Sequence, residues 1–170
     1  YTLDDIVTLS PNMLSLKNKI SKISDTNSSV MIFGETGTGK ELVAQSLFTC
    51  GNRKNKKFVS QNCAAIPSTL LESILFGTIK GSFTGSLSRP GLFEIANGGV
   101  LFLDEINSME LSVQPKILKA IEEKKITRVG GEEPIDIDVK IISAINEDPI
   151  KCIKENKLRE DLFYRLSVVY

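Results

Sequence analysis

The sequence predicts an α/β fold in which a parallel sheet is flanked by helices. Three observations support this fold class: short apolar runs alternate with amphipathic segments, a glycine-rich loop joins the first run to the first helix, and the apolar run 99–106 ends close to two acids. Strands that alternate with helices are typical of parallel sheets with right-handed crossovers. A chain of 170 residues is long enough for one domain with a substantial core.

The first half of the chain supplies the first two strands and their helices. SVMIF at 29–33 is a short apolar run that predicts a buried strand. The spacing of apolar residues over 40–50 predicts a helix that ends before Gly51. FVSQN at 58–62 predicts a second strand, and the segment 67–76 opens with proline and predicts a helix that Gly77 ends.

The second half continues the alternation. The continuous apolar run 99–106 predicts a central strand of a parallel sheet. An amphipathic helix is expected over 114–125, strands at 125–129 and 137–144, and a short charged helix over 157–166. The last residues, LSVVY, predict a further strand.

The composition excludes several classes of protein. Apolar residues make up 41% and charged residues 25%, so the chain is neither disordered nor fibrous, and its formal net charge is zero. No apolar stretch approaches the roughly 20 residues that span a bilayer, and the N-terminus lacks the features of a signal peptide. The three cysteines lack metal or redox spacing and indicate reduced thiols in the cytoplasm. The absence of histidine excludes histidine-based catalysis and metal binding.

A glycine-rich loop, GETGTGK at 34–40, directly follows the first predicted strand and opens the first predicted helix. An ordinary turn before a helix is the alternative, but strand, glycine spacing, lysine and helix in this order favour a phosphate-binding loop. Its backbone N–H groups and the helix N-terminus are expected to face phosphate oxygens. The loop therefore predicts a nucleotide as the ligand, with its phosphates held by Gly34, Glu35, Thr36, Gly37, Thr38, Gly39 and Lys40.

Magnesium is expected at the paired acids Asp104 and Glu105. Glu41 stands where phosphate loops usually have a serine or threonine that binds Mg²⁺, so Asp104, water and the phosphates must hold the metal. The acids follow a buried strand, at the edge where open α/β sheets bind ligands. We expect Asp104 to hold the Mg²⁺ shell and Glu105 to polarise an attacking water. Two acids could simply mark the solvent end of a strand, but their place after a phosphate loop favours hydrolysis.

Four segments together resemble a known family: GETGTGKE, GSFTGS, ANGGVLFLDEI and LREDLFYRL. They are similar to the central AAA+ ATPase domain of sigma-54-dependent bacterial transcription activators. The resemblance implies that residues 1–170 form the AAA+ sigma-54-interaction ATPase domain, as its α/β subdomain without the helical lid. It also implies ATP as the nucleotide, a hexameric ring in the full-length protein, the sigma-54 RNA polymerase holoenzyme as partner, and DNA binding through a separate domain. Glu41 is the family's usual residue after the lysine.

The segment GSFTGS at 81–86 resembles the family's GAFTGA signature. In the family this sequence tips a surface loop that contacts the sigma factor, which implies a contact made by Gly81, Ser82, Phe83, Thr84, Gly85 and Ser86. Ser82 and Ser86 replace the family's usual alanines. From the six residues alone, an ordinary glycine-rich turn is the simpler interpretation.

Further site residues follow from the resemblance alone. Asn62 stands where the family has an asparagine that hydrogen-bonds the catalytic glutamate and relays nucleotide state to the loop. Arg159 and Arg165 match arginines that act on the γ-phosphate of the neighbouring subunit, although a salt-bridged helix face is an equally good interpretation of the bare sequence. Asn146 matches the first sensor, and the preceding Ile145 replaces the family's threonine and cannot hydrogen-bond through its side chain. The stretch 128–138 corresponds to a second mobile loop.

The resulting prediction is an ATPase that remodels the sigma-54 holoenzyme for promoter opening. Two alternatives stay open: another AAA+ remodelling ATPase with a different client protein, and a nucleotide-gated interaction module without enzymatic activity.

Overall fold

The main sheet of the computed structural model has four parallel strands in the order β1-β8-β5-β2. The structure describes residues 1–81 and 87–169. The strands of this sheet are β1 (Val30–Phe33), β2 (Phe58–Asn62), β5 (Val100–Asp104) and β8 (Lys140–Ile145). The α/β fold that the sequence predicts is therefore confirmed.

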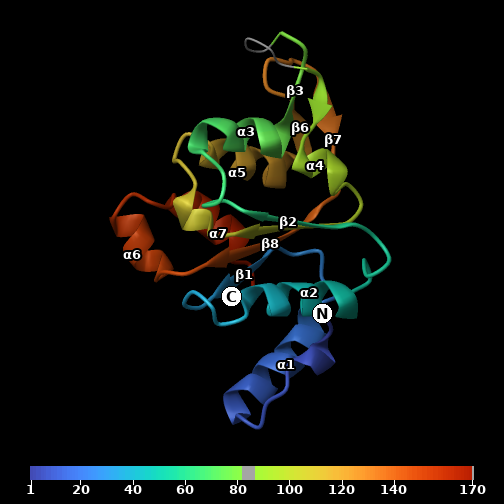
Figure 1. Ribbon diagram of the computed structural model, residues 1–170, viewed down its shortest axis with the longest axis vertical. Helices are drawn as coiled ribbons and strands as arrows, with labels where there is room; N and C mark the ends of the chain where they lie inside the picture. Colours follow the sequence, from blue (N-terminus) through green and yellow to red (C-terminus); the bar gives the residue numbers. More distant parts are fainter. Residues whose placement is uncertain (82–86, 170) are drawn as a thin grey trace.

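Helices cover both faces of this sheet (Figure 1). One face carries α1 (Pro11–Ile23) and α2 (Lys40–Cys50), while the short 3-10 helix η1 (Leu3–Asp5) contacts α2. The helices that pack into the core on the other face are α3 (Ser68–Phe76), α4 (Leu92–Ile95), α5 (Gln114–Glu123), α6 (Pro149–Lys154) and α7 (Glu160–Leu166).

The central strand β5 shows why two layers of helices are needed. Val100 and Phe102 pack into the core beside α1 and α2, whereas Leu101 and Leu103 pack into the core on the other face. Successive side chains of a strand point to opposite faces, so a continuous apolar run is buried on both sides. The run that predicts this strand thus also explains the three-layer architecture.

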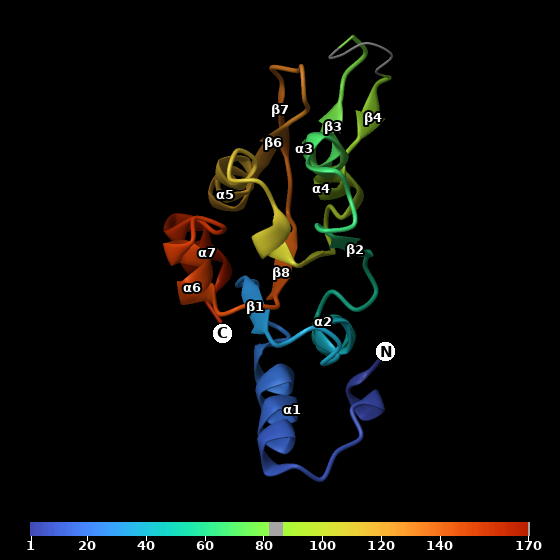
Figure 2. The ribbon, with the colours of Figure 1, turned by 60° about the vertical axis from the view of Figure 1, so that its left-hand side comes forward.

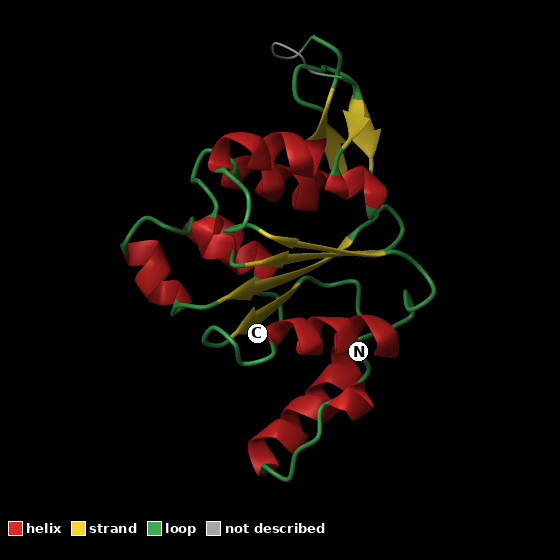
Figure 3. Cartoon of the chain, in the orientation of Figure 1, coloured by secondary structure: helices red, strands yellow, loops and turns green. Residues whose placement is uncertain are grey.

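Two short hairpins project from one end of the molecule (Figures 2 and 3). In the first, β3 (Gly77–Thr78) pairs with β4 (Arg89–Pro90), and these strands flank the segment 79–88. In the second, β6 (Lys125–Thr127) pairs with β7 (Pro134–Asp136). The strand that the sequence predicts at 125–129 thus begins correctly but lies outside the main sheet, and the one predicted at 137–144 begins three residues later, at Lys140.

Three α-helices of the described residues, α1, α4 and α6, are not predicted from the sequence, although start signals precede α1 and α6. Ser10 and Pro11 open α1, and Asp148 and Pro149 open α6, where the Asp148 carboxylate accepts a hydrogen bond from the Ile150 N–H. Proline in the first turn after such a residue favours a helix start. Across the part of the chain that the structure describes, every helix is too short or too polar to cross a membrane.

Candidate functional site

The phosphate loop connects β1 to α2 and has the backbone that its glycines allow. Gly37 and Gly39 adopt φ angles of 82° and 86°, in the left-handed region that other residues rarely enter. A Cβ atom at Gly37 would meet no atom within 4 Å, so the positive φ angle, and not a close approach, is what favours glycine there. The first N–H groups of α2 have no acceptor within the helix and are available to an anion.

Lys40 is buried at the start of α2, and its ammonium group lies inside the loop. Its Nζ atom donates hydrogen bonds to the carbonyl oxygens of Gly34 and Glu35, each at 2.9 Å. Lysine carries three donors on a flexible stem, so the same ammonium can exchange these carbonyls for phosphate oxygens. The loop therefore fits a polyphosphate and holds the cation that such a ligand requires.

The carboxyl ends of β1 and β8 bring a second polar residue to this loop. The Gly34 N–H donates to the Ile145 carbonyl at 3.2 Å, which fixes the loop against the end of β8. Asn146 follows directly, and its Nδ2 atom lies 3.5 Å from the Thr36 hydroxyl. The Ile145 side chain is fully buried, so Asn146 is the polar group that the end of β8 presents to the loop.

Asp104 and Glu105 lie at the corresponding end of β5. An Asp104 oxygen accepts a hydrogen bond from the Glu105 N–H at 2.9 Å, and Glu105 turns away from the strand with a φ of 52°. Carboxylate oxygens suit Mg²⁺. The described residues contain no cluster of three possible protein ligands. Asp104 thus fits the magnesium site that the sequence predicts, in which water and phosphate oxygens supply the remaining ligands.

Asn62 lies beside these acids at the end of β2. It is the register partner of Asp104, and its Nδ2 atom donates to Glu105 Oε1 at 3.4 Å. Its Oδ1 atom accepts from the N–H groups of Ala64 and Ala65 at 2.8 and 3.2 Å. The Asn62 amide thus connects Glu105 to the turn that leads into α3.

The negative charge of this site affects the pKa of the buried Cys63 thiol. Burial, together with the nearby carboxylates of Asp104 and Glu105, which oppose a thiolate, raises its pKa to about 12. Cys152 is also buried, whereas Cys50 is exposed.

Arg159 lies at the start of α7 and Arg165 lies within that helix. Arg159 precedes the first helical residue and donates to both carboxylate oxygens of Asp161, at 3.0 and 2.8 Å, and this pairing raises its pKa. Arg165 is exposed on the last turn. Within residues 1–81 and 87–169, neither arginine is bonded to the phosphate loop of its own chain.

The base of the 81–86 loop is well connected, although Ser82, Phe83, Thr84, Gly85 and Ser86 lie outside the described residues. Gly81 sits in the turn that follows β3. The strand itself exchanges backbone hydrogen bonds with the segment after β6: the Val129 N–H donates to Gly77 and the Ile79 N–H donates to Val129, at 2.9 and 3.3 Å. The two projecting hairpins are therefore joined at their bases.

An ion pair reinforces this junction. Arg128 donates two hydrogen bonds to the carboxylate of Glu94 in α4, at 2.8 and 2.7 Å. This bidentate pairing lowers the pKa of Glu94, which also accepts a hydrogen bond from the Gly91 N–H. The segment 128–138, which resembles a second mobile loop of the family, is thus held by α4, the helix that follows the 81–86 loop and β4.

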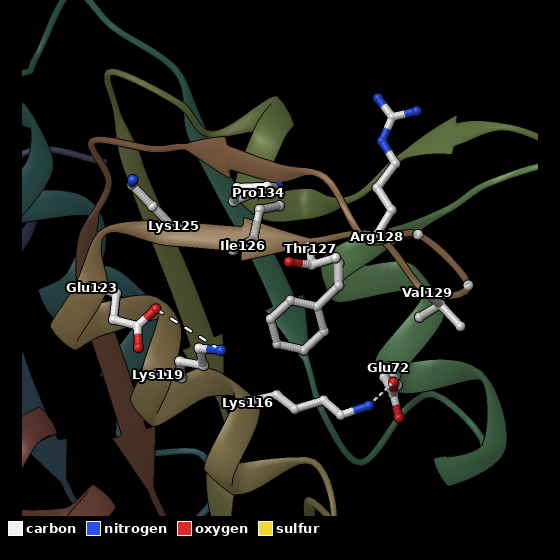
Figure 4. A pocket seen from close by; sticks show the side chains of 13 residues that line it. Glu72, Lys116, Lys119, Glu123, Lys125, Ile126, Thr127, Arg128, Val129 and Pro134 are labelled. Carbon is white, nitrogen blue, oxygen red and sulfur yellow. Dashed lines mark hydrogen bonds and ion pairs between the residues drawn. The ribbon is translucent and has the colours of Figure 1, made fainter.

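A cavity of about 380 Å³ lies beneath the hairpins, between α3, α5 and β6 (Figure 4). It is rich in cations, but Lys116 is paired with Glu72 and Lys119 with Glu123. Arg128 is likewise paired, and the ammonium of Lys125 lies 3.7 Å from Asp136. Paired charges of this kind do not favour a phosphate ligand, so the phosphate loop is the better nucleotide site.

The fold and the site together define a P-loop nucleoside triphosphatase domain: a parallel sheet with a phosphate loop after β1 and an acid at the end of β5. The described parts of the site meet at the carboxyl ends of the parallel strands, where open α/β sheets bind ligands. The P-loop domain of a sigma-54 activator from Escherichia coli has the same fold, with a TM-score of 0.63 at 16% identity.

The chain belongs to the sigma-54 interaction domain family, whose profile matches residues 6–170. It is 53% identical over 169 residues to the transcriptional activator RocR of Bacillus subtilis, covering 99% of this chain and 37% of RocR. It is 47% identical to the regulatory protein AtoC of Escherichia coli, covering 97% of this chain and 36% of AtoC. The chain thus spans little more than a third of these relatives.

A solved structure supports the same assignment. The crystal structure of NtrX from Brucella abortus in complex with ATP aligns with a TM-score of 0.88 and 40% identity, covering 96% of this chain and 37% of NtrX. An ADP complex of the same protein aligns equally well, with a TM-score of 0.89. Family membership and fold are therefore shown by sequence and by structure.

The structure adds polar residues that the sequence analysis does not identify. Asn107, Gln114, Glu147 and Lys157 link the neighbourhood of the phosphate loop to the backbone of Arg159. Of these residues, only Gln114 could have been identified from the sequence, because it is a polar residue at a position of the amphipathic helix that faces the core. The ion pair between Glu94 and Arg128 joins segments whose proximity the sequence does not reveal.

Proposed function

We propose that the chain binds and hydrolyses ATP and uses that reaction to remodel the sigma-54 RNA polymerase holoenzyme for promoter opening. The observation that carries this proposal is the hydrogen bond between Asn62 and Glu105 at the ends of neighbouring strands. It joins the residue placed to polarise water to the segment that leads, through α3, to the 81–86 loop. Membership in the sigma-54 interaction domain family supports the choice of partner.

In this proposal, each site residue has one task in binding or hydrolysis. The loop 34–40 and Glu41 hold ATP, Lys40 neutralises phosphate charge, and Asn146 contacts the terminal phosphate. Asp104 holds the hydrated Mg²⁺, which supplies charge neutralisation on the phosphates when bound. Glu105 orients and polarises the attacking water. The crystal structures of NtrX in complex with ATP and with ADP support nucleotide binding by this chain.

The proposal also includes assembly into a ring, in which Arg159 and Arg165 reach the ATP of the neighbouring subunit. The planar guanidinium group suits this task because it donates paired, charge-assisted hydrogen bonds to phosphate oxygens. The exposure of both arginines supports action in a neighbouring site. We also propose that the full-length protein carries a helical lid, forms a hexameric ring and acts in the cytoplasm.

Movement of the 81–86 loop would follow from a change at Glu105. When the attacking water donates to its carboxylate, the hydrogen bond from Asn62 weakens, because 3.4 Å is already at the long end of the range. Asn62 holds the N–H groups of the turn 63–65, so its displacement shifts the start of α3. That helix ends directly at β3, the strand that supports the loop.

The substitution Glu105→Gln tests the hydrolytic part of the proposal. Glutamine keeps the shape and an acceptor for Asn62 but cannot polarise water as a carboxylate does, so we expect ATP affinity within about threefold of wild type and turnover lowered at least 100-fold. Steady-state ATPase assays and equilibrium binding of a fluorescent ATP analogue, made on the protein as its gene encodes it, measure the two quantities.

The exposed Glu110→Gln variant, which makes the same change outside the site, is the matched control and should hydrolyse ATP normally. Wild-type turnover in Glu105→Gln would refute the assigned role. A protein that binds ATP but never hydrolyses it would instead favour the nucleotide-gated interaction module.

A further inference from the structure

A chain of hydrogen bonds leads from the phosphate loop toward Arg159. Its first member is Asn146, whose Nδ2 atom lies 3.5 Å from the Thr36 hydroxyl. The Oδ1 atom of Asn146 accepts a hydrogen bond of 2.8 Å from the Nδ2 atom of Asn107. Asn107 lies only two residues after Glu105, in η2 (Ile106–Ser108). The polar residue at the loop is thus tied to the segment that follows the proposed catalytic acid.

Asn107 shares its amide between two acceptors. Besides Asn146, the same Nδ2 atom donates to Glu147 Oε1 at 3.0 Å, while the Oδ1 atom of Asn107 is buried and accepts no hydrogen bond from the described residues. Within the described residues, the Asn107 amide is therefore held through its Nδ2 atom and not through its Oδ1 atom. If Asn146 turns toward a phosphate, Asn107 can shift toward Glu147 without breaking a bond on its other side.

Glu147 continues the chain through an ion pair. The Nζ atom of Lys157 donates to both carboxylate oxygens of Glu147, at 3.2 and 2.9 Å, and also contacts Glu155 at 3.0 Å. The pairing lowers the pKa of Glu147 and raises the pKa of Lys157, because each charge stabilises the other. A shift of the Glu147 carboxylate therefore acts on Lys157.

Gln114 joins the backbone of Lys157 to that of Arg159. Its side chain is fully buried at the start of α5. The Nε2 atom donates to the Lys157 and Met109 carbonyl oxygens at 2.9 and 3.0 Å, and the Oε1 atom accepts from the Arg159 N–H at 2.8 Å. A buried amide with these three partners makes the segment 157–159 move as one unit.

We propose that Asn107 and the Glu147–Lys157 ion pair are positioning residues that make the location of Arg159 depend on the nucleotide held by the same subunit. The inference rests on the proposed function, in which Arg159 acts on the nucleotide of the next subunit. The nucleotide bound by one subunit then changes the position of the Arg159 side chain at the nucleotide of the next subunit.

The test compares Lys157→Met, with and without Arg159→Ala, in the protein as its gene encodes it. If Lys157 acts through Arg159, Lys157→Met lowers the single-turnover hydrolysis rate about tenfold in the wild-type background, with ATP affinity unchanged. In the Arg159→Ala background it then has no further effect, because the group that it positions is absent. Asn107→Ala is expected to follow the same pattern.

Lys154→Met removes an exposed lysine from neighbouring α6 and serves as the control, with hydrolysis expected at the wild-type rate. Equal rate losses from Lys157→Met in both backgrounds would overturn the inference, since a general structural defect does not depend on Arg159. Wild-type hydrolysis in Arg159→Ala would also overturn it. Failure of the proposed function is distinguishable, because it appears as wild-type hydrolysis in Glu105→Gln.

Discussion

At the scale of single residues, the site depends on side chains that share hydrogen-bond partners. The Asn62 amide serves both Glu105 and the turn before α3, and the Asn107 amide serves both Asn146 and Glu147. An amide that bridges two groups transmits a change at either one, because its donors and acceptor are fixed on one rigid plane. Shared amides, more than the charged groups, thus connect the nucleotide site to its surroundings.

The chemistry of the site was more predictable from sequence than its connections. Lys40, Asp104 and Glu105 carry motifs whose spacing is local, so a strand, a loop and a helix suffice to place them. Asn107 and Lys157 are 50 residues apart and are linked through Glu147, to which both donate hydrogen bonds. No local pattern marks such a pair, and sequence reasoning from one chain therefore missed it.

Thiol reactivity tests the electrostatics of the site at this scale. At pH 8 we expect iodoacetamide to modify the exposed Cys50 and to leave Cys63 unmodified, because burial and the two nearby carboxylates hold the Cys63 pKa at about 12. Mass spectrometry of native and urea-unfolded protein counts the modified thiols. The variant Cys50→Ser removes the fast-reacting thiol, and modification of Cys63 at the rate of Cys50 would contradict the assignment.

At the scale of elements, the sequence predicts the helices next to the phosphate loop and the 81–86 loop well, but it does not predict α1. The predicted helices at 40–50 and 67–76 match α2 and α3 within one residue. Helix α1 is not predicted, although four of its apolar residues recur at helical spacing and pack into the core on its face of the sheet: Met13, Leu16, Ile20 and Ile23. A buried lysine from β8 also holds the C-terminal end of this helix.

That lysine, Lys140, is 3% exposed and donates to the Ser24 carbonyl at 2.7 Å, at the end of α1. Burial and the nearby Arg53 lower its pKa to about 8, from 10.5. Between these values the unfolded chain binds more protons than the folded one, so the free energy of unfolding rises with pH. We expect Lys140 to contribute a rise of about 1 kcal/mol between pH 8 and 9.

Urea unfolding at pH 8 and 9 measures this contribution, and Lys140→Met should remove it. The interval stops at pH 9 because Cys63, whose pKa is raised, acts in the opposite direction above that value. The control Lys22→Met removes an exposed lysine of α1 and should keep the rise. An unchanged pH dependence in Lys140→Met would show that this lysine titrates normally.

At the scale of the whole molecule, the fold separates the phosphate loop and the paired acids from the hairpins to which we assign partner contact. The loop and the acids lie at the carboxyl ends of the strands, whereas the hairpins project from one end of the molecule (Figure 2). Contacts through α3, the Val129 backbone and the Glu94–Arg128 pair connect the two. The sequence indicated both regions, but their physical connection is visible only in the structure.

In the proposed function, nucleotide state controls a contact between the 81–86 loop and sigma-54. The most direct test of this control is the binding of purified sigma-54 by the protein as its gene encodes it, with and without an ATP transition-state analogue. Thr84→Ala alters the loop, and Thr69→Ala makes the same change on the exposed part of α3. We predict analogue-dependent binding for wild type and Thr69→Ala, and at least tenfold weaker binding for Thr84→Ala with normal ATP hydrolysis. Analogue-dependent binding of wild-type strength by Thr84→Ala would contradict the claim.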